Sequence, residues 1–304
     1  MRGRLKWYIM KFGLRARFVS CPAGPFGVLD MLDMVRRGIV LKLVASDMDG
    51  TLLNSQKELP AHLFPVLRQL FDRGVRFAVA SGRQYYNLRQ LFEPVQEQVS
   101  FISENGAMVI DRGRSLWVSE IPEALVTAVV EAIRGAGGLM PVLSGEKSAY
   151  VDSDVPFFME NVALYYTRCQ RVGDVLEAAR RDRICKIAVF DMENAETHAY
   201  PLLQPFDNAL GVVLSGTHWV DLMNPGVNKG EAIRVFQKEY GIAPDECMAF
   251  GDYLNDYEML QVCGENYAMA NAHPKLKAVS RHVAKSNDEN GVVDAICSVF
   301  GIQI

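Results

Sequence analysis

The fold of this 304-residue chain is decided by the stretch Asp47-Met48-Asp49-Gly50-Thr51, which follows an apolar run from Ile39 to Ser46. A short β-branched run of this kind predicts a buried strand, and Gly50 lets the chain turn where the strand ends. Both carboxylates then face one crevice, and in an open parallel sheet ligands bind at the carboxyl ends of the strands. Two acids at this spacing suit a divided task, in which one attacks as a nucleophile and the other moves a proton. The alternative is an Asp-rich turn without chemistry.

A second group of acids follows another predicted strand, Cys247–Gly251, in the sequence Gly251-Asp252-Tyr253-Leu254-Asn255-Asp256. Parallel topology brings this group to the same edge of the sheet as Asp47. Carboxylates gathered in one crevice repel one another unless a cation lies among them, and oxygen ligands without His or Cys select a hard ion such as Mg²⁺. The sequence therefore predicts a Mg²⁺ site, although a helix N-cap would account for Asp252 or Asp256 taken alone.

Two further segments carry groups that suit a phosphate. Ser81-Gly82-Arg83 ends the predicted strand Arg76–Ser81, where the hydroxyl and the next helix's N–H groups point the same way. Lys229 opens the predicted helix Lys229–Tyr240, and its ammonium would offset the charge of nucleophile and substrate. Alone, the first is a common turn and the second a solvated surface lysine. We expect folding to survive replacement of Lys229, because the position begins a helix and needs no buried salt bridge.

The order of the predicted elements indicates two domains. Strands and helices alternate along residues 40–121 and again from 222 to 304, which predicts a parallel sheet with right-handed crossovers. Residues 122–221 combine helices with short strands and a hairpin around Gly216-Thr217, which predicts an α+β insertion. The predicted fold class is α/β: a Rossmann-like parallel-sheet core, discontinuous in sequence, with an inserted cap domain.

Composition and charge narrow the class of protein. Apolar residues make up 49% of the chain and charged residues 22%, which are values of a globular protein. No apolar run approaches the roughly 20 residues that a membrane span needs, and a net charge of −4 argues against a nucleic-acid partner. The six cysteines have no metal-ligand spacing. Free thiols are typical of a reducing cytosol, so we expect a cytoplasmic protein.

The first 39 residues differ from the rest. They hold eight Lys or Arg and two Asp, a net charge of +6, whereas residues 40–304 carry −10. A mitochondrial-type presequence fits this basic leader. We favour a simpler interpretation, in which the leader is a disordered tail or an extension translated from a start codon placed too early. We expect it to contribute nothing to activity or folding.

Together, these segments resemble the haloacid dehalogenase (HAD) superfamily of phosphohydrolases, in its Cof-type branch, subfamily IIB. The main matches are Asp47 to Leu53, Ala80 to Arg83, Lys229 within Gly226-Val227-Asn228-Lys229-Gly230, and Gly251 to Asp256. Supporting matches are Glu104-Asn105-Gly106-Ala107, Ala268 to Ala272, and Lys285 to Asn287. At the cap hinge, Asp221-Leu222 stands where relatives often have Glu-Ile, a difference that could tune substrate choice.

The resemblance implies a two-step phosphoryl transfer. Asp47 would attack phosphorus to form an aspartyl-phosphate, while Asp49 would protonate the leaving alcohol and then deprotonate the hydrolytic water. Mg²⁺ would be bound by the Asp47 carboxylate, the Asp49 backbone carbonyl and Asp252, with Asp256 either a direct ligand or a residue that contacts the ligands. The phosphoryl oxygens would be bound by Ser81, Gly82 and Lys229. Asn255 and Asn105 would line the pocket.

The predicted function is therefore a Mg²⁺-dependent phosphatase of small phosphorylated metabolites, with sugar phosphates first and phosphorylated cofactors next. A sugar phosphomutase uses the same acids and is the alternative enzyme. A non-catalytic binding module is a weaker alternative, because Asp47 and Asp49 are both present. Substrate specificity is expected from the cap, with the stretch Ser144 to Tyr166 as the candidate.

Overall fold

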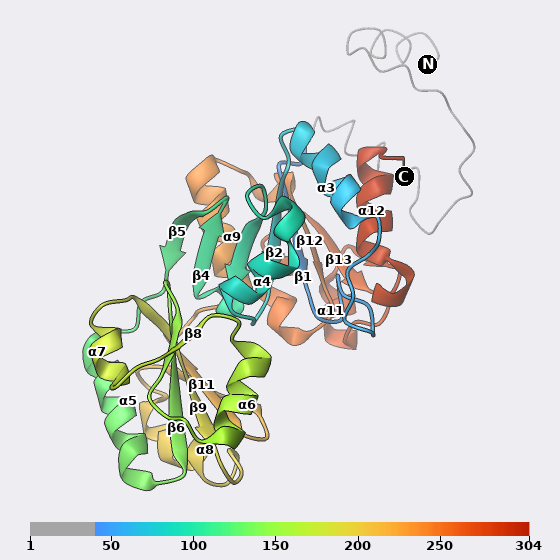
Figure 1. Cartoon of the computed structure of the whole chain (residues 1–304). Coiled ribbons are helices and arrows are strands. Elements are labelled where there is room, and N and C mark those ends of the chain that lie inside the picture. Colours follow the sequence, from blue (N-terminus) through green and yellow to red (C-terminus); the bar gives the residue numbers. More distant parts are fainter. Residues whose placement is uncertain (1–39, 304) are drawn as a thin grey trace, which may run out of the picture. The chain divides into compact units, whose positions relative to one another are not determined.

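The computed structural model describes residues 40–303. The predicted basic leader, residues 1–39, lies outside the described residues, so the expectations about it stay predictions. Within the described chain, two β-sheets with their own helices account for most of the regular structure (Figure 1). The mixed α/β fold that the sequence predicts is confirmed. The domain bounds at 121/122 and 221/222 stay a prediction.

The larger sheet has eight strands in the order β14-β13-β12-β1-β2-β3-β4-β5. Its strands are β1 (Leu43–Asp47), β2 (Arg76–Ala80), β3 (Ser100–Ser103), β4 (Met108–Asp111), β5 (Arg114–Val118), β12 (Cys247–Gly251), β13 (Glu265–Met269) and β14 (His282–Ala284). The neighbouring pairs from β14 to β3 are all parallel. β1 lies at the centre, and all five of its residues are buried, as expected for a parallel strand covered on both faces.

The pairs β3–β4 and β4–β5 are antiparallel, which differs from the parallel sheet that the sequence predicts. Short turns make both connections: the 3₁₀ turn Glu104–Gly106 joins β3 to β4, and a two-residue turn joins β4 to β5. Arg112 (φ 50°) and Gly113 (φ 80°) both adopt positive φ between β4 and β5. Two consecutive residues with positive φ match the twist of a two-residue hairpin.

The helices that accompany the larger sheet come from both of its sequence segments. They are α3 (Leu63–Asp72), α4 (Tyr85–Leu91), α9 (Lys229–Tyr240), α10 (Tyr257–Gln261), α11 (Pro274–Val279) and α12 (Gly291–Phe300), with the 3₁₀ turns η1 (Glu93–Val95), η2 (Glu104–Gly106), η4 (Pro244–Glu246), η5 (Leu254–Asp256) and η6 (Asn287–Glu289). α9 has the bounds that the sequence predicts. The Asn228 side chain accepts a hydrogen bond from the Glu231 N–H at its start, and Gly241 ends it in the left-handed region.

The second sheet has six strands in the order β10-β11-β9-β6-β7-β8 and is antiparallel except for the pair β7–β8. Its elements are β6 (Leu139–Gly145), β7 (Ala149–Val151), β8 (Cys169–Arg171), β9 (Ile184–Asp191), β10 (Gly211–Gly216) and β11 (Trp219–Met223), with the helices α5 (Glu123–Ala136), α6 (Pro156–Tyr165), α7 (Val175–Ala179) and α8 (Ala199–Leu203) and the turn η3 (Gln204–Phe206). We call this part the cap sheet. One of its apolar clusters includes α5, α7 and α8, and the other includes α6.

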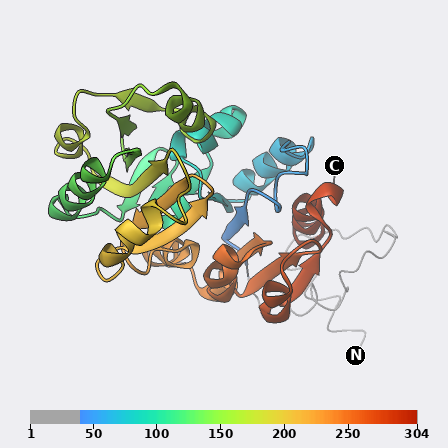
Figure 2. The same ribbon diagram turned by 90° about the horizontal axis from the view of Figure 1, so that it is seen from below.

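The insertion leaves the chain's two outer segments adjacent in space. Figure 2 shows the blue N-terminal strand beside the orange and red elements of the C-terminal segment, and the register agrees, because Leu43 pairs with Cys247 and Ser46 with Phe250. This pairing carries two distant aspartate groups to one edge of the sheet.

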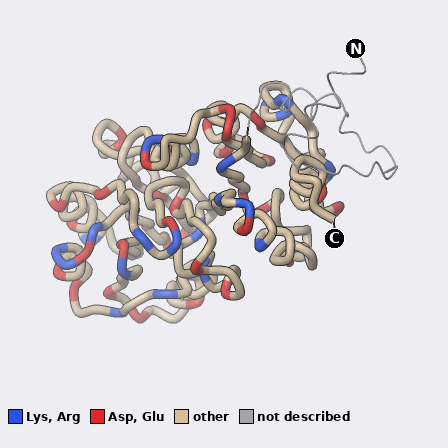
Figure 3. The backbone as a smooth tube through the Cα atoms, turned by 90° about the horizontal axis from the view of Figure 1, so that it is seen from above, with Lys and Arg blue, Asp and Glu red and all other residues tan. Residues whose placement is uncertain are grey.

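Charged residues are distributed along the described chain without a dominant block of one sign (Figure 3). Figure 3 shows acidic and basic positions interspersed along the described chain. Among residues 40–303, no helix has both the length and the apolarity that crossing a bilayer requires. The five cysteines in this range are free thiols.

Candidate active site

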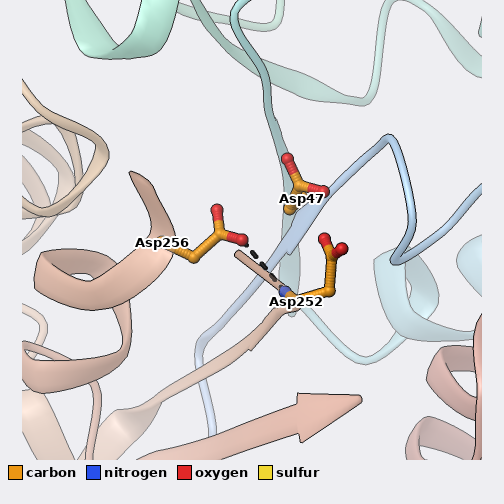
Figure 4. A group of neighbouring side chains, drawn as sticks. All are labelled: Asp47, Asp252 and Asp256. Carbon is orange, nitrogen blue, oxygen red and sulfur yellow. Dashed lines mark hydrogen bonds between the residues drawn. The ribbon is translucent and has the colours of Figure 1, made fainter. Parts of the chain in front are cut away.

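Three aspartates meet at the carboxyl ends of β1 and β12. Asp47 is the last residue of β1, Asp252 follows β12 directly, and Asp256 ends the η5 turn. One carboxylate oxygen from each lies within 4.8 Å of the other two (Figure 4). The predicted convergence of the two acidic segments is confirmed, because β1 and β12 are parallel neighbours.

Lys229 lies inside this group of acids. Its Nζ is 2.5 Å from Asp47 Oδ1 and 2.6 Å from Asp256 Oδ1, and its side chain is fully buried. Burial lowers the pKa of Lys229, but the two carboxylates outweigh it and hold the pKa above its usual value. The expectation that Lys229 needs no buried salt bridge is wrong. Helix α9 begins at the sheet edge, so its first side chain points into the site rather than into solvent.

Asp256 organises the loop after β12. Its Oδ2 accepts hydrogen bonds from the N–H groups of Asp252 (3.0 Å) and Tyr253 (3.2 Å), while Oδ1 accepts from Lys229. Figure 4 shows the Asp256 carboxylate directed at the Asp252 backbone. Because both of its oxygens already have partners, Asp256 suits the role of holding Lys229 and the loop better than that of a direct metal ligand.

Asp47 keeps one oxygen free. Its Oδ2 is buried and accepts no hydrogen bond from the described residues. Burial, together with the nearby charges of Asp256 and Asp252, raises the pKa of Asp47 to about 8, against the opposing effect of Lys229. A buried carboxylate oxygen without a donor is costly. A divalent cation would satisfy it, and an all-oxygen set next to one lysine suits a hard ion.

Gly50 and Thr51, which follow Asp49, fix the position of the Asp252 carboxylate. Thr51 donates its hydroxyl to Asp252 Oδ1 at 2.9 Å. Gly50 has φ +82°, and a Cβ at this position would lie 2.4 Å from Asp252 Oδ2. Any larger residue at position 50 would therefore displace Asp252, which explains why glycine stands between the two acids and Thr51.

Asp49 lies apart from the three-carboxylate group. Arg83 donates two hydrogen bonds to its carboxylate, from Nε to Oδ2 at 2.9 Å and from Nη2 to Oδ1 at 2.8 Å. Lys57 Nζ donates a third hydrogen bond to Oδ1 at 2.8 Å. Burial raises the pKa of Asp49, but the hydrogen bonds from Arg83 and Lys57 outweigh it and hold the pKa below its usual value. Sequence reasoning gave neither cation a role. The only signal was the position of Arg83 after Ser81-Gly82.

The predicted phosphate segment lies on the other side of β1. Asp47 pairs with Ala80 on β2, so Ser81 follows directly beside the carboxylate group. Ser81 is buried, and its Oγ accepts a hydrogen bond from the Arg83 N–H at 3.2 Å. A Cβ at Gly82 would lie 3.0 Å from Asn105 Nδ2.

Asn105 and Asn255 meet at the edge of the same region. Asn105 has φ 54°, its N–H donates to the Ser81 carbonyl at 2.9 Å, and its Oδ1 accepts from Asn255 Nδ2 at 3.3 Å. The turn η2 therefore connects the phosphate segment to the loop that carries Asp252 and Asp256.

A cavity of about 640 Å³ opens between the cap and one part of this region, the segments around Asp49, Ser81 and Asn105. Asp47, Lys229, Asp252 and Asp256 are not among its lining residues. Its core side includes Asp49, Lys57, Ser81, Gly82, Arg83, Gln84, Asn87 and Asn105, and its cap side includes Leu164, Tyr165, Tyr166, Lys186, Ser215, Trp219 and Asp221. Only three of the cap residues fall in the predicted stretch Ser144 to Tyr166. The other four come from β9, β10 and β11, which strand pairing alone brings to the cavity.

Comparison with known proteins gives a consistent result. Residues 44–296 match the family model described as haloacid dehalogenase-like hydrolase. The chain is similar to 5-amino-6-(5-phospho-D-ribitylamino)uracil phosphatase YbjI of Escherichia coli strain K12, with 34% identity over 86% of this chain and 96% of that protein.

Solved structures show the same fold. A protein of Streptococcus mutans is 31% identical, with a TM-score of 0.71, over 86% of this chain and all of the other. A sugar phosphatase described as HAD subclass IIB is 23% identical, with a TM-score of 0.67, over 86% of this chain and all of the other. The resemblance inferred from the sequence motifs is confirmed.

Proposed function

The chain belongs to the haloacid dehalogenase-like hydrolases and is a phosphatase of that type, and on this basis we propose that it hydrolyses small phosphorylated metabolites with Mg²⁺, through an aspartyl-phosphate on Asp47. The observation that carries the proposal is the free, buried Oδ2 of Asp47, which lies among Asp252, Asp256 and Lys229. It leaves the Asp47 carboxylate available for attack beside a set of acids that suits a cation.

In the proposed reaction, Asp47 attacks phosphorus in line with the leaving alcohol. When bound by the Asp47 carboxylate, the Asp49 backbone carbonyl and Asp252, Mg²⁺ supplies positive charge that offsets the charge of nucleophile and phosphate. Lys229 holds the nucleophile and, with Ser81 and Gly82, binds phosphoryl oxygens. Asp256 keeps Lys229 in place. Positioning and charge neutralisation supply most of the rate enhancement in such transfers.

Asp49 is the proposed proton donor to the leaving group and the base for the second step. In this structure its carboxylate is occupied by Arg83 and Lys57, both of which line the cavity. An entering phosphate is a stronger anion and would compete for the same two cations. We propose that their movement towards the phosphate frees Asp49 for proton transfer.

The size of the cavity and the named relative support a small substrate. A cavity of about 640 Å³ is in the usual range for small-molecule sites. The named activity of the Escherichia coli relative is removal of phosphate from a ribityl chain attached to a uracil ring. We propose phosphate monoesters of polyhydroxylated alcohols as substrates, whether free sugar phosphates or cofactor precursors with such a chain.

The test is a phosphate-release screen across sugar phosphates, nucleotides and phosphorylated cofactors, with Mg²⁺ or with excess chelator. We expect release that depends on Mg²⁺ and is lost in Asp47→Asn. Formation of an isomerised sugar phosphate without free phosphate would instead support the phosphomutase alternative. Binding without turnover of any ester would support a binding module.

A further inference from the structure

The cap side of the cavity contains charged residues that the proposed chemistry does not use. Asp221 on β11 pairs with Ala188 on β9, so Asp221, Ala188 and Lys186 lie on the same face of the cap sheet. The opposite face packs Leu222 and Ile187 into a separate apolar cluster. On the first face, the charged residues Lys186 and Asp221 line the cavity.

Lys186 is a buried cation supplied by the cap and paired with the core. Its Nζ lies 2.5 Å from Glu104 Oε2, and the two residues are 7% and 1% exposed. Burial lowers the pKa of Lys186, but the carboxylates of Asp221 and Glu104 outweigh it and hold the pKa well above its usual value. Removing two charges from water is expensive and adds little to stability, so this pair calls for another explanation than stability alone.

Glu104 connects that cation to the phosphate segment. It occupies the left-handed region (φ 49°), and the next residue, Asn105, donates its N–H to the Ser81 carbonyl. Lys186 and Ser81 also line the same cavity, so one small substrate that fills it can contact both.

Asp221 is the unpaired member of the group. It lines the cavity, and among residues 40–303 no hydrogen bond or ion pair reaches its carboxylate. The Lys186 ammonium is in an ion pair with Glu104, so Asp221 is left, within the described chain, as the carboxylate without a partner at ion-pair distance. The cavity therefore presents one group that can only donate hydrogen bonds and one that can only accept them.

We propose that Lys186 and Asp221 bind adjacent hydroxyl groups of the leaving alcohol, and that Glu104 is a positioning residue that holds Lys186 for this contact. The proposal rests on the proposed phosphatase function and adds the residues that select its substrate. A hydroxyl both donates and accepts, so one hydroxyl accepts from Lys186 while its neighbour donates to Asp221. An alkyl chain of the same length would leave both charged groups without partners, which is a strong basis for discrimination.

The experiment compares ribitol 5-phosphate with n-pentyl phosphate, two primary phosphate esters of the same chain length that differ in hydroxyl groups. The measured quantity is the ratio of their kcat/KM values with Mg²⁺. We expect the unmodified protein to prefer ribitol 5-phosphate, and Asp221→Ala to reduce the ratio about tenfold or more. The matched control is Glu160→Gln, which removes one negative charge from the exposed surface of α6, outside the cavity.

Lys186 and Glu104 are tested as a pair, because either single change leaves a buried charge alone. We expect Lys186→Met/Glu104→Gln to reduce the same ratio at least as much as Asp221→Ala. Glu104→Gln alone should reduce it as much as Lys186→Met alone, and the double variant should show little additional loss. That pattern identifies a residue that acts through Lys186. If these variants do not fold, Asp221→Ala decides the proposal.

Two results separate this proposal from the proposed function. A protein that hydrolyses both esters with Mg²⁺ at similar kcat/KM, or whose ratio is unchanged in Asp221→Ala, keeps the phosphatase function and overturns the hydroxyl contacts. A protein that releases no phosphate from these esters or from the wider screen overturns the function, and the contacts with it.

Discussion

Two buried lysines are paired with carboxylates, one at the edge of the core sheet and one in the cap, and they differ in how they are held. Lys229 bridges Asp47 and Asp256, all within the core sheet and its loops. Lys186 reaches from the cap sheet to Glu104 in the core. The first arrangement assembles the proposed chemistry on one rigid sheet edge. The second depends on the cap and core being together, so it suits selection of the substrate better than bond breaking.

The largest expected effect breaks the core arrangement at its nucleophile. Asp47→Asn should reduce kcat by about 10⁵-fold and abolish labelling of the protein by a phosphorylated substrate, because the attacking oxygen is gone. Asp49→Asn keeps that oxygen but loses proton transfer. With nitrophenyl phosphate, the leaving group needs little protonation, so in Asp49→Asn the rate of phosphoenzyme formation should fall less than the rate of its hydrolysis. Phosphoenzyme should therefore accumulate in this variant.

Intact-protein mass spectrometry after a rapid acid quench measures the added phosphoryl group. Label on Asp49→Asn together with none on Asp47→Asn is the expected result. Label on Asp47→Asn would show that the nucleophile has been assigned to the wrong residue.

The next effect tests whether Lys229 is structural as well as catalytic. Lys229→Met should cost about 2–4 kcal/mol of transition-state stabilisation. It should also lower the free energy of unfolding by about 3–5 kcal/mol, because Asp47 and Asp256 lose their buried partner. Steady-state kinetics and urea unfolding measure the two effects. Near-normal turnover in a stable variant would contradict both roles.

A smaller effect separates the two lysine sites by their response to Mg²⁺. At about 100 times its dissociation constant, Mg²⁺ should stabilise the folded protein by about 2.7 kcal/mol. Asp252→Asn should lose most of this gain, whereas Asp221→Asn should keep it, since its carboxylate lies at the cap wall. Thermal unfolding with and without Mg²⁺ provides the measurement. An equal loss in both variants would place the metal elsewhere.

The smallest effect contrasts these buried pairs with an exposed one. Lys57→Ala removes a contact to Asp49 in which the lysine side chain is 62% exposed. We expect the free energy of unfolding to change by less than about 1 kcal/mol, because solvent screens the pair. Urea unfolding provides the check, and a loss close to that expected for Lys229→Met would contradict the distinction between buried and exposed pairs.

The main chemical groups were readable from the sequence because each lies at the end of a strand. Asp47 ends β1, Ser81 and Asp252 follow β2 and β12, and neighbouring parallel strands end at one edge of the sheet. Helix α9 was equally clear from its apolar spacing and its terminal Gly241. The β4–β5 hairpin was missed because its two-residue turn uses Arg112-Gly113, which is a weak hairpin signal compared with Asn-Gly.

What the sequence determined by itself is the set of local signals: the strand ends, the acids placed on them, and the helix that begins at Lys229. Tertiary structure alone decided that Lys229 is buried. It also decided that Arg83 and Lys57 donate hydrogen bonds to Asp49. The ion pair of Lys186 with Glu104, near Asp221, likewise depends on the tertiary structure. The physical reason is the sequence separation over which each kind of interaction acts. Hydrophobic periodicity and turn chemistry act between residues a few positions apart. Ion pairs between the core and the cap depend on strand pairing across the whole chain.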